Sequence, residues 1–406
     1  MSRYDELCAR LYAARRFGMV LGLDRMRGAL DRIGAPDRRL GQVVHVGGTN
    51  GKGSTVAMIA ALARGGGARV ATYTSPHLST LRERVTIDGE LASEDALVDA
   101  AREVDPGLTF FEQITAIAMA VIARAGVDIT VLEVGLGGRL DATNVVDAPV
   151  AVVTGVALDH EAILGGTLEA IAFEKAGIFK RGRAAVIGAS GEPAAVPVLV
   201  EHARAAGVAR LTTVDDDAIA RVPDLALAGA HQRRNAAAAV AAIEALGLRV
   251  EPAALARVSH PGRFERAGDL VLDGAHNPHG ARALAATLRE LGMRPVLVVA
   301  VSADKDARAI AEALAPEVRA VVATRYQQDR TLAPEPLADA FRAATSAPVE
   351  TARDLEAAVA RARELGGPVL VAGSLFLVGE ARTRWLGAPT DAIALADPAR
   401  PGARAR

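Results

Sequence analysis

The chain has 406 residues, of which 50% are hydrophobic and 23% charged, and its formal net charge is −1. This soluble, globular composition gives no support for nucleic acid or a membrane surface held by bulk charge, and the length predicts two domains. The single cysteine, Cys8, excludes an intramolecular disulfide. The N-terminus lacks a signal-peptide pattern, and no apolar run reaches the ~20 residues of a membrane helix. We therefore expect a cytoplasmic protein.

The first part of the chain alternates between strand and helix patterns. Strands are expected at 42–46, 69–74, 128–134 and 150–156, and helices at 54–64, 93–103 and 112–125. Ser93 is a favourable N-cap for its helix, and acidic residues follow it in the first turn. Strands that alternate with helices imply a mostly parallel sheet covered on both faces.

The alternation pauses at HPGRFERAG, residues 260–268, and then restarts with strands expected at 269–273, 295–301, 320–324 and 368–372. The predicted fold class is α/β: an N-terminal P-loop ATPase domain with a mostly parallel sheet over 1–259, a linker over 260–267, and a smaller C-terminal Rossmann-like α/β domain over 268–406. The residues from 387 onward lack a clear period, and we expect a mobile tail there.

A glycine-rich stretch, GGTNGKGS at residues 47–54, follows the first expected strand and opens a helix. Glycines let backbone N–H groups turn onto phosphate oxygens, the helix N-terminus adds partial positive charge, and a lysine reaches the outer phosphates. The strict G-x-x-x-x-G-K-[ST] pattern is not matched, because Gly53 stands between Lys52 and Ser54. The setting predicts a nucleotide-binding loop, and the alternative is an ordinary tight turn.

Three polar residues follow neighbouring expected strands. Glu133 lies at the carboxyl end of the strand expected at 128–134. His160 follows the strand expected at 150–156, and Ser75 follows the strand expected at 69–74. Ligands of α/β sheets bind at the carboxyl ends of the strands, and Mg²⁺ prefers hard oxygen ligands. The pattern predicts a metal site beside the nucleotide. The alternatives are a solvated acid, a structural histidine and a turn serine.

Lysine is scarce, since only Lys52, Lys175, Lys180 and Lys305 stand among 47 basic residues. A composition that favours arginine leaves lysine where side-chain chemistry resists replacement. Two of the four lie in EKAGIFK, residues 174–180. An amine can lose its proton whereas a guanidinium cannot, so these two lysines are candidates for a role that arginine cannot fill.

An ordered set of motifs carries a resemblance to a known family. The motifs are GTNGKGS (48–54), TSPHL (74–78), FFE (110–112), EVGLGGRLDATN (133–144), LDH (158–160), EKAGIFK (174–180), HPGRFE (260–265), DGAHNP (273–278) and AGSLFLVGE (372–380). Together they resemble the Mur ligase superfamily, and closely its folylpolyglutamate synthase/dihydrofolate synthase branch.

The resemblance implies roles for individual residues. The nucleotide would be bound by Gly51, Lys52, Gly53, Ser54, Asn235, Arg263 and Asp273, and Mg²⁺, two ions in all, by Ser75, Glu133, His160 and a modified Lys175. In this family the lysine that matches Lys175 is carbamylated by CO₂. The pterin or folate substrate would lie against Leu21, Gly22, Thr109, Phe110, Phe111, Glu112, Leu140, Asp141 and Ala142.

The resemblance also implies a reaction. A substrate carboxylate takes the γ-phosphoryl group of ATP, the amine of L-glutamate attacks the acyl phosphate, and ADP and phosphate are released. Lys52, Lys175 and His276 are the catalytic candidates, with His276 placed to contact the intermediate or the amino acid. The expected partners are ATP, L-glutamate and dihydropteroate or a reduced folate, with neither nucleic acid nor membrane. A monomer that closes its domains on ATP is expected.

Several functions stay open at this point. A bifunctional dihydrofolate synthase/folylpolyglutamate synthase is favoured. Some bifunctional relatives carry an acidic residue where this chain has Val20, so an enzyme with folylpolyglutamate synthase activity only is an alternative. Another Mur-type amino-acid ligase is disfavoured by TFFE and GRLDATN, and by only about 40 residues before the phosphate strand. A P-loop nucleotide switch is the alternative from another class.

Overall fold

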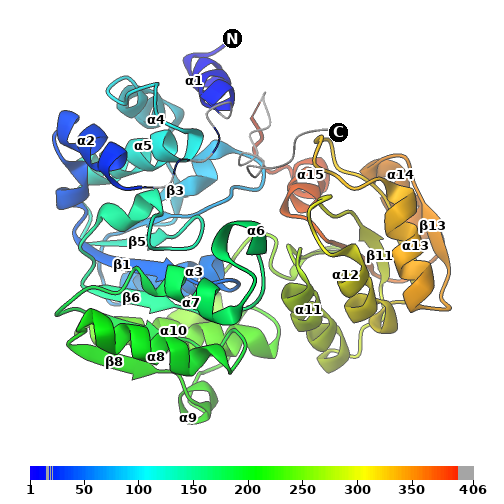
Figure 1. The fold of residues 1–406 in the computed structure, drawn as a ribbon. Coiled ribbons are helices and arrows are strands. Elements are labelled where there is room, and N and C mark those ends of the chain that lie inside the picture. Colours follow the sequence, from blue (N-terminus) through cyan, green and yellow to red (C-terminus); the bar gives the residue numbers. More distant parts are fainter. Residues whose placement is uncertain (15–17, 19, 21, 392–406) are drawn as a thin grey trace. The chain divides into compact units, whose positions relative to one another are not determined.

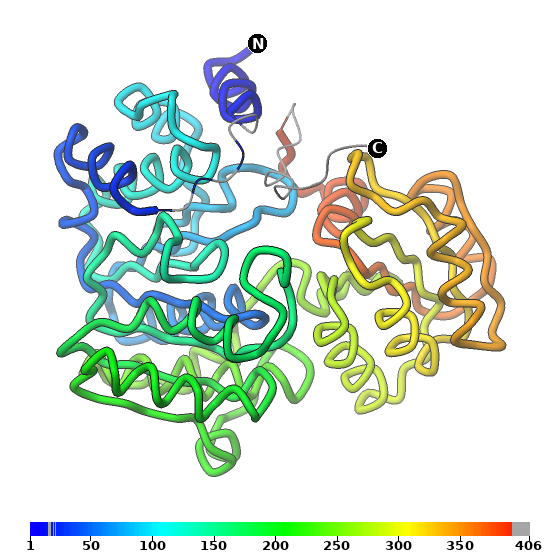
Figure 2. The backbone as a smooth tube through the Cα atoms, in the orientation of Figure 1, coloured from blue at the N-terminus to red at the C-terminus, as the bar shows by residue number. Residues whose placement is uncertain are grey.

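The computed structural model describes residues 1–14, 18, 20 and 22–391. The chain divides into two compact units, each with its own sheet (Figures 1 and 2). Unit 1 comprises residues 1–226 and 232–258 together with Asp391, and unit 2 comprises 227–231 and 259–390. The stretch 260–267, expected as a linker, is thus part of unit 2, where it contributes a strand.

The sheet of unit 1 has eight strands over the described residues, in the order β4-β3-β2-β5-β1-β6-β7-β8. All neighbours are parallel except β2–β3 and β3–β4. The strands are β1 (Gln42–Gly47), β2 (Val70–Tyr73), β3 (Val85–Ile87), β4 (Glu90–Leu91), β5 (Ile129–Glu133), β6 (Val150–Val153), β7 (Ala184–Ile187) and β8 (Arg210–Thr213).

Helices lie on both faces of this sheet (Figure 1). They are α1 (Arg3–Ala13), α2 (Asp24–Arg32), α3 (Lys52–Gly65), α4 (Glu94–Ala101), α5 (Phe110–Ala125), α6 (Glu161–Leu164), α7 (Leu168–Ala176), α8 (Ala195–Ala206), α9 (Asp216–Ala220) and α10 (Ala230–Ala245), with 3₁₀ turns η2 (Pro36–Arg39), η3 (Leu81–Arg84), η4 (Ala142–Val145) and η5 (Pro252–Arg257).

Local sequence signals set several of these boundaries. The Ser93 side chain accepts a hydrogen bond from the N–H of Ala96 at 3.2 Å, so α4 begins where the N-cap predicted. The strand expected over 150–156 ends earlier, at Val153. Beyond it the chain stays hydrogen-bonded to neighbouring segments, since the Thr154 N–H donates to the Gly47 carbonyl and the Gly155 carbonyl accepts the Thr49 N–H, both at 2.9 Å.

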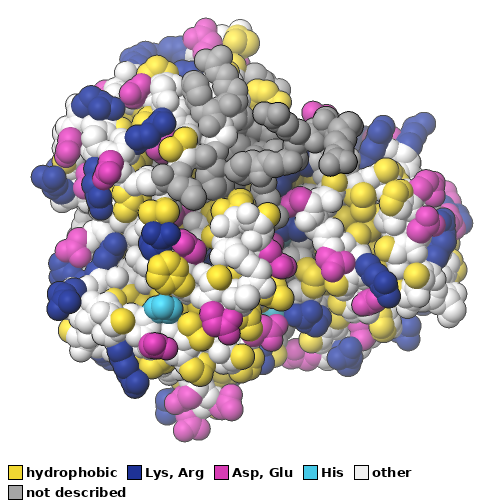
Figure 3. Space-filling model, in the orientation of Figure 1, with side chains coloured by type: hydrophobic (Ala, Val, Ile, Leu, Met, Phe, Trp, Pro, Cys, Tyr) yellow, Lys and Arg dark blue, Asp and Glu magenta, His cyan; other side chains and the backbone are white. Residues whose placement is uncertain are grey.

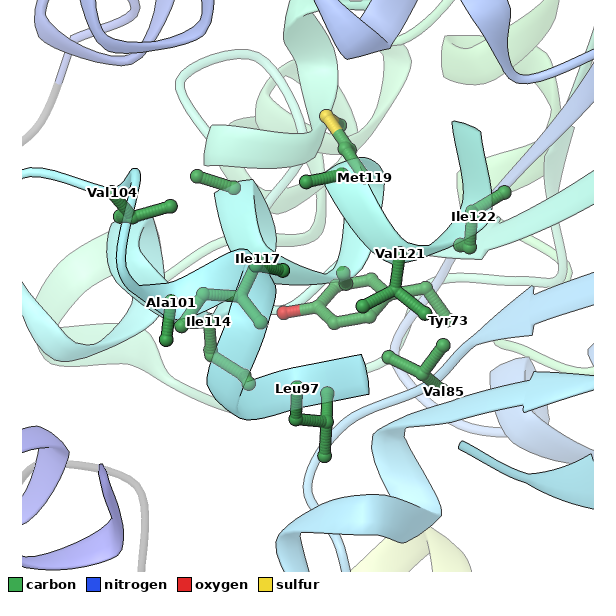
Figure 4. Packing of buried hydrophobic residues seen from close by; sticks show 14 of the residues in the cluster. Tyr73, Val85, Leu97, Ala101, Val104, Ile114, Ile117, Met119, Val121 and Ile122 are labelled. Carbon is green, nitrogen blue, oxygen red and sulfur yellow. The ribbon is translucent and has the colours of Figure 1, made fainter. Parts of the chain in front are cut away.

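One face of the sheet packs against α4 and α5 through a large apolar cluster (Figure 4). Tyr73 of β2 and Val85 of β3 meet Leu97 of α4 and Ile114 and Ile117 of α5, and all five side chains are buried. A second cluster joins β6 and β7 to α7 and α8. These two cores hold rigid the strands whose ends carry the candidate site.

Unit 2 is a six-stranded sheet in the order β13-β12-β11-β14-β10-β9, parallel except for the pair β9–β10. Its strands are β9 (Glu265–Ala267), β10 (Leu270–Leu272), β11 (Val296–Val299), β12 (Ala320–Ala323), β13 (Val349–Thr351) and β14 (Val369–Ala372). Its helices are α11 (Pro278–Glu290), α12 (Ala307–Leu314), α13 (Pro334–Ala344), α14 (Leu355–Glu364) and α15 (Leu375–Leu386), with the turn η6 (Ala315–Glu317). The α/β class with two mostly parallel sheets is confirmed.

The last described residue returns to unit 1. The Asp391 carboxylate accepts hydrogen bonds from the Tyr4 hydroxyl at 3.0 Å, the Thr80 hydroxyl at 2.6 Å and the Leu81 N–H at 2.7 Å. Its side chain is buried there, so residues near both ends of the chain share one polar cluster.

The surface carries both signs of charge. On the face drawn in Figure 3, basic and acidic side chains are interspersed, as the net charge of −1 leads one to expect. Within the described part of the chain, no helix combines the length and the apolar character that crossing a bilayer requires.

Candidate functional site

The candidate site lies at the carboxyl ends of β1, β2, β5 and β6. In the sheet, β5 and β2 lie on one side of β1, and β6 lies on its other side, so the strand order reverses direction at β1. Such a change of direction opens a crevice where α/β sheets bind ligands. Glu133 is the last residue of β5, and its Oε2 accepts the N–H of Ser75 at 3.2 Å. The structure therefore brings together two of the four residues predicted to bind metal, Ser75 and Glu133.

The glycine-rich loop joins β1 to α3. Gly51 is the N-cap of α3 with a φ of 84°, and no side chain caps the helix there. The first turn of α3 also holds no acidic residue. The N–H groups of Lys52, Gly53 and Ser54 therefore start a helix whose positive end is available to an anion, as phosphate binding requires.

Hydrogen bonds hold this loop against the residues that follow β6. The Thr154 hydroxyl donates to the carbonyl of Asn50 at 2.7 Å, and the Thr49 N–H donates to the carbonyl of Gly155 at 2.9 Å. Gly48 has a φ of 141°, and a Cβ on it would collide with the Thr154 hydroxyl. The close approach of the two segments explains why this position is glycine.

Two of the four lysines converge on one carbonyl oxygen. The Nζ atoms of Lys52 and Lys175 both donate to the carbonyl oxygen of Gly48, at 3.2 and 3.0 Å. Lys175 is 4% exposed, and burial together with the neighbouring charge of Lys52 lowers the pKa of its amine to about 7. A substantial fraction of this amine is therefore neutral near pH 7. An amine in this environment can lose its proton, which an arginine guanidinium cannot.

The predicted metal ligands offer a partial set. Glu133 is buried and Ser75 half-buried, and their carboxylate and hydroxyl oxygens suit Mg²⁺. His160 begins α6 in the left-handed conformation, with a φ of 56°, and its Nε2 lies 3.8 Å from Asp159 Oδ2. Among the described residues, no group of three histidine, cysteine or acidic side chains is arranged to hold a metal. Mg²⁺ usually keeps several waters and takes substrate phosphates beside one or two carboxylates, so a small protein set is compatible with it.

The loop from Gly135 to Val145 carries the predicted acceptor residues Leu140, Asp141 and Ala142. The Asp141 carboxylate accepts the Thr143 hydroxyl at 2.5 Å, the Thr143 N–H at 3.0 Å and the Leu136 N–H at 2.9 Å. Burial raises the pKa of this carboxyl, and these hydrogen bonds oppose the shift. Asp141 and Ala142 are buried, whereas Leu140 is partly exposed.

The TFFE stretch starts α5. Thr109 is its N-cap and forms a capping box with Glu112, whose carboxylate accepts the Thr109 N–H at 2.8 Å. Phe110 is fully buried in the apolar cluster, with the Arg84 guanidinium 5.3 Å from its ring centre. Phe111 is partly exposed and packs so tightly on Gly135 that a Cβ there would strike its ring. Of the two phenylalanines, Phe111 is thus the one that can offer a surface to an acceptor.

The N-terminal acceptor segment is only partly described. Leu21 lies outside the described residues. Gly22 is partly exposed with a φ of 133°, and Val20 is 39% exposed. No hydrogen bond of the described set links them to the loop of Asp141.

Asn235 of α10 lies against the glycine-rich loop. A Cβ on Gly51 would collide with the Asn235 Oδ1 atom, so the helix and the loop are in close contact. The Ser190 hydroxyl donates to this Oδ1 at 2.8 Å, and the Asn235 Nδ2 donates to Gln232 Oε1 at 3.0 Å. Its place beside the phosphate-binding loop suits the predicted nucleotide role.

Three predicted residues belong to unit 2. The Asp273 carboxylate accepts the N–H groups of Phe264 and Ala275, both at 2.9 Å, and burial raises its pKa although Arg263 opposes this. The Arg263 guanidinium donates to the carbonyl of Gly262 at 3.1 Å. His276 precedes the N-cap of α11, and its Nδ1 lies 2.8 Å from the Gly274 carbonyl oxygen.

Sequence reasoning missed the residues that fix Lys175 and Asp141 in place. Asn144 donates to the carbonyls of Arg139 and Gly177, both at 3.0 Å, and so ties the Asp141 loop to the end of α7. Lys180 donates to Asn144 Oδ1 at 2.8 Å and so supports this link. Scarcity flagged Lys180, but only the fold shows that it meets Asn144.

The comparisons with known proteins agree with this arrangement. A model described as the Mur ligase middle domain matches residues 46–243, and one described as Mur ligase, glutamate ligase domain, matches 262–375. These matches define a Mur ligase. Within that class, the chain belongs to the dihydrofolate synthase/folylpolyglutamate synthase family, because the enzyme of that name from Mycobacterium tuberculosis is 35% identical over 89% of each chain.

A longer relative and two solved structures extend the comparison. The probable bifunctional folylpolyglutamate synthase/dihydropteroate synthase of Haloferax volcanii is 37% identical over 94% of this chain, which spans about half (50%) of that relative's length. The Escherichia coli FolC structure in complex with DHPP and ADP is 31% identical, with a TM-score of 0.80 over 90% of this chain and 93% of that one. A bifunctional synthase with Mn, AMPPNP and L-glutamate bound is 30% identical, with a TM-score of 0.79 over 90% of this chain and 94% of that one.

Proposed function

We propose that the chain is an ATP-dependent ligase that adds L-glutamate to dihydropteroate and to reduced folates. The observation that carries the proposal is the meeting of Lys52, buried Lys175 and the open start of α3 at one edge of the sheet, with Glu133 ending a strand at that edge. Related structures hold ADP with DHPP, or AMPPNP with Mn and L-glutamate, which are the ligand classes that this reaction needs.

The residues of unit 1 have distinct parts in the proposed reaction. The first-turn N–H groups of α3 and the Lys52 amine orient the phosphates and stabilise charge on the transferred phosphoryl group. Ser75, Glu133 and His160 would hold Mg²⁺, which when bound neutralises phosphate charge. The acceptor carboxylate then attacks in line, and the amine of L-glutamate displaces phosphate from the resulting acyl phosphate.

Lys175 has a further proposed state, a carbamate. Its neutral amine nitrogen attacks the carbon of CO₂, one N–C bond forms, and one proton leaves to give an anion. The two amines on the single carbonyl oxygen of Gly48 repel each other when both are protonated, whereas a carbamate would pair with Lys52 or with the metal. Arginine cannot undergo this reaction because its guanidinium stays protonated.

The unit 2 residues enter the proposal on resemblance alone. Arg263 and Asp273 would contact the nucleotide, and His276 would contact the amino acid or the tetrahedral intermediate. Neither the monomeric state nor the cytoplasmic location expected from the sequence is tested by the structure, so both stay predictions.

The first experiment measures ADP release by the purified protein with Mg-ATP, L-glutamate and bicarbonate. Dihydropteroate and tetrahydrofolate are compared as acceptors. Turnover with both would establish a bifunctional synthase, and turnover with tetrahydrofolate alone would establish a glutamate-chain extender and direct attention to Val20. If neither acceptor gives glutamate-dependent turnover, the proposal is overturned in favour of another ligase or a nucleotide switch.

A pair of lysine variants tests the carbamate. Lys175→Arg keeps a positive charge but cannot react with CO₂, so its activity should fall and should not respond to bicarbonate. Lys305→Arg makes the same change at a lysine without a proposed role and should keep wild-type activity. Full activity in Lys175→Arg would refute carbamylation while leaving the ligase proposal standing.

A further inference from the structure

A fully buried histidine stands within the valine-rich strand β1. His45 is 0% exposed and lies between Val44 and Val46 in the strand. Side chains alternate along a strand, so His45 lies on the same face as Val43, which packs in the cluster that contains α5. There its Nε2 lies 2.8 Å from the Thr143 hydroxyl oxygen of η4.

The hydrogen bonds around Thr143 fix the direction of the interaction. The hydroxyl has one proton, which it donates to Asp141 Oδ1 at 2.5 Å. Its oxygen must therefore accept from His45, which places the ring proton on Nε2. The result is a directed chain from the His45 N–H through the Thr143 hydroxyl to the Asp141 carboxylate.

This arrangement is unfavourable for folding on its own. The His45 Nδ1 atom is buried and has no hydrogen-bond partner among the described residues. Burial and the charge of Lys180 lower the pKa of the ring to about 3, so the ring is neutral at physiological pH. Valine would fit a central parallel strand without an unsatisfied acceptor, so the histidine needs another explanation.

We infer that His45 and Thr143 are positioning residues that hold the Asp141 carboxylate oriented and ionised for the acceptor's heteroaromatic ring. The inference rests on the proposed function, because it presumes that Asp141 meets the pterin-bearing acceptor. A pterin ring carries N–H donors, and an ionised carboxylate accepts such hydrogen bonds while a protonated carboxyl competes as a donor.

The hydrogen bond from the Thr143 hydroxyl to the Asp141 carboxylate can be removed without removing the other hydrogen bonds of this carboxylate. Asp141 also accepts the backbone N–H groups of Thr143 and Leu136, and these would survive a change of the Thr143 side chain. The turn η4 therefore keeps its cap when the hydroxyl is removed. Burial would then favour the protonated carboxyl more strongly, since one hydrogen bond to the charged form is lost.

The experiment compares Thr143→Val with Thr143→Ser in the full-length protein. Valine keeps the shape and removes the hydroxyl, whereas serine keeps the hydroxyl and removes a methyl group. We expect Thr143→Val to raise the KM for the acceptor roughly tenfold, the effect of one hydrogen bond to a charged group, with the KM for ATP unchanged. Thr143→Ser should keep the wild-type KM for the acceptor. His45→Val should raise the KM for the acceptor by a smaller factor, about threefold.

The outcomes separate this inference from the function on which it rests. If the wild-type protein turns over an acceptor and Thr143→Val has the same acceptor KM, the positioning role is refuted and the ligase stands. Equal losses in the valine and serine variants, with both KM values raised and the melting temperature lowered, would reduce Thr143 to a structural residue. If the wild-type protein neither binds nor turns over dihydropteroate or tetrahydrofolate, the proposed function and this inference fail together.

Discussion

Replacing His45 by valine should change how the stability of unit 1 depends on pH. The native protein keeps this ring neutral, because burial and Lys180 lower its pKa to about 3, whereas in the unfolded chain the ring has a pKa of about 6.5. Between these two values the unfolded state binds one more proton than the native state. Stability must therefore fall as pH decreases through 6.5, and it keeps falling until pH 3.

The size of the effect follows from the two pKa values. At pH 8 the histidine is neutral in both states and contributes nothing to the slope. At pH 5 the unfolded ring is almost fully protonated, and the native state loses about 2 kcal/mol relative to its stability at pH 8. His45→Val removes this term, so we expect the variant to gain about 2 kcal/mol relative to the wild type between pH 8 and pH 5.

Urea unfolding of both proteins at pH 8, 7, 6 and 5 measures this difference. The single tryptophan, Trp385, lies in unit 2, so its fluorescence follows that unit, while far-ultraviolet circular dichroism follows both. Every other titrating group is common to the two proteins and cancels in the comparison. Parallel pH profiles for the wild type and His45→Val would refute the claim that the ring is held neutral.

Three further changes have defined outcomes. Gly48→Ala should abolish ADP release and lower the melting temperature, because its Cβ would collide with the Thr154 hydroxyl in a loop with positive φ. Ser93→Ala should cost about 1 kcal/mol in urea unfolding and leave turnover unchanged, since it removes only the N-cap of α4; a loss of turnover would show that α4 matters to the site. Asp391→Ala should destabilise unit 1 by about 2 kcal/mol, because it leaves the buried Tyr4 hydroxyl without that acceptor, and an unchanged unfolding midpoint would contradict the contact.

The sequence predicted the elements whose patterns are strong. The strands at β1, β2 and β5 and the cap of α4 were expected within a few residues, because apolar runs and a serine N-cap are local signals. The short strands β3 and β4 were missed. They are three and two residues long, too short for a clear alternating pattern, and only β3 pairs with β2, whereas β4 pairs with β3. The Asp88-Gly89 turn between them is a local hairpin signal that the sequence analysis did not use.

The sequence indicated which residues belong to the candidate site, but it did not indicate how they are arranged. Scarcity singled out Lys175, but its shared acceptor with Lys52 emerges only when α7 and the glycine-rich loop come together. Phe110 matched a substrate motif, yet the structure places it in the core, because a motif does not reveal which side of a helix a residue occupies. His45 gave no functional signal, since a lone histidine in a strand is read as packing.

The buried contacts of Asp391 have a consequence for synthesis of the protein. Thr80 and Asp391 are 311 positions apart, and the bond between them belongs to unit 1. A ribosome adds roughly 5–20 residues per second, so Thr80 waits about 15–60 s for its partner. During that interval unit 2 has been made and can fold, while the nascent first unit lacks one of its buried carboxylates. Unit 1 acquires its last described contact from Asp391. We therefore expect the folding of unit 1 to finish only after Asp391 has left the exit tunnel.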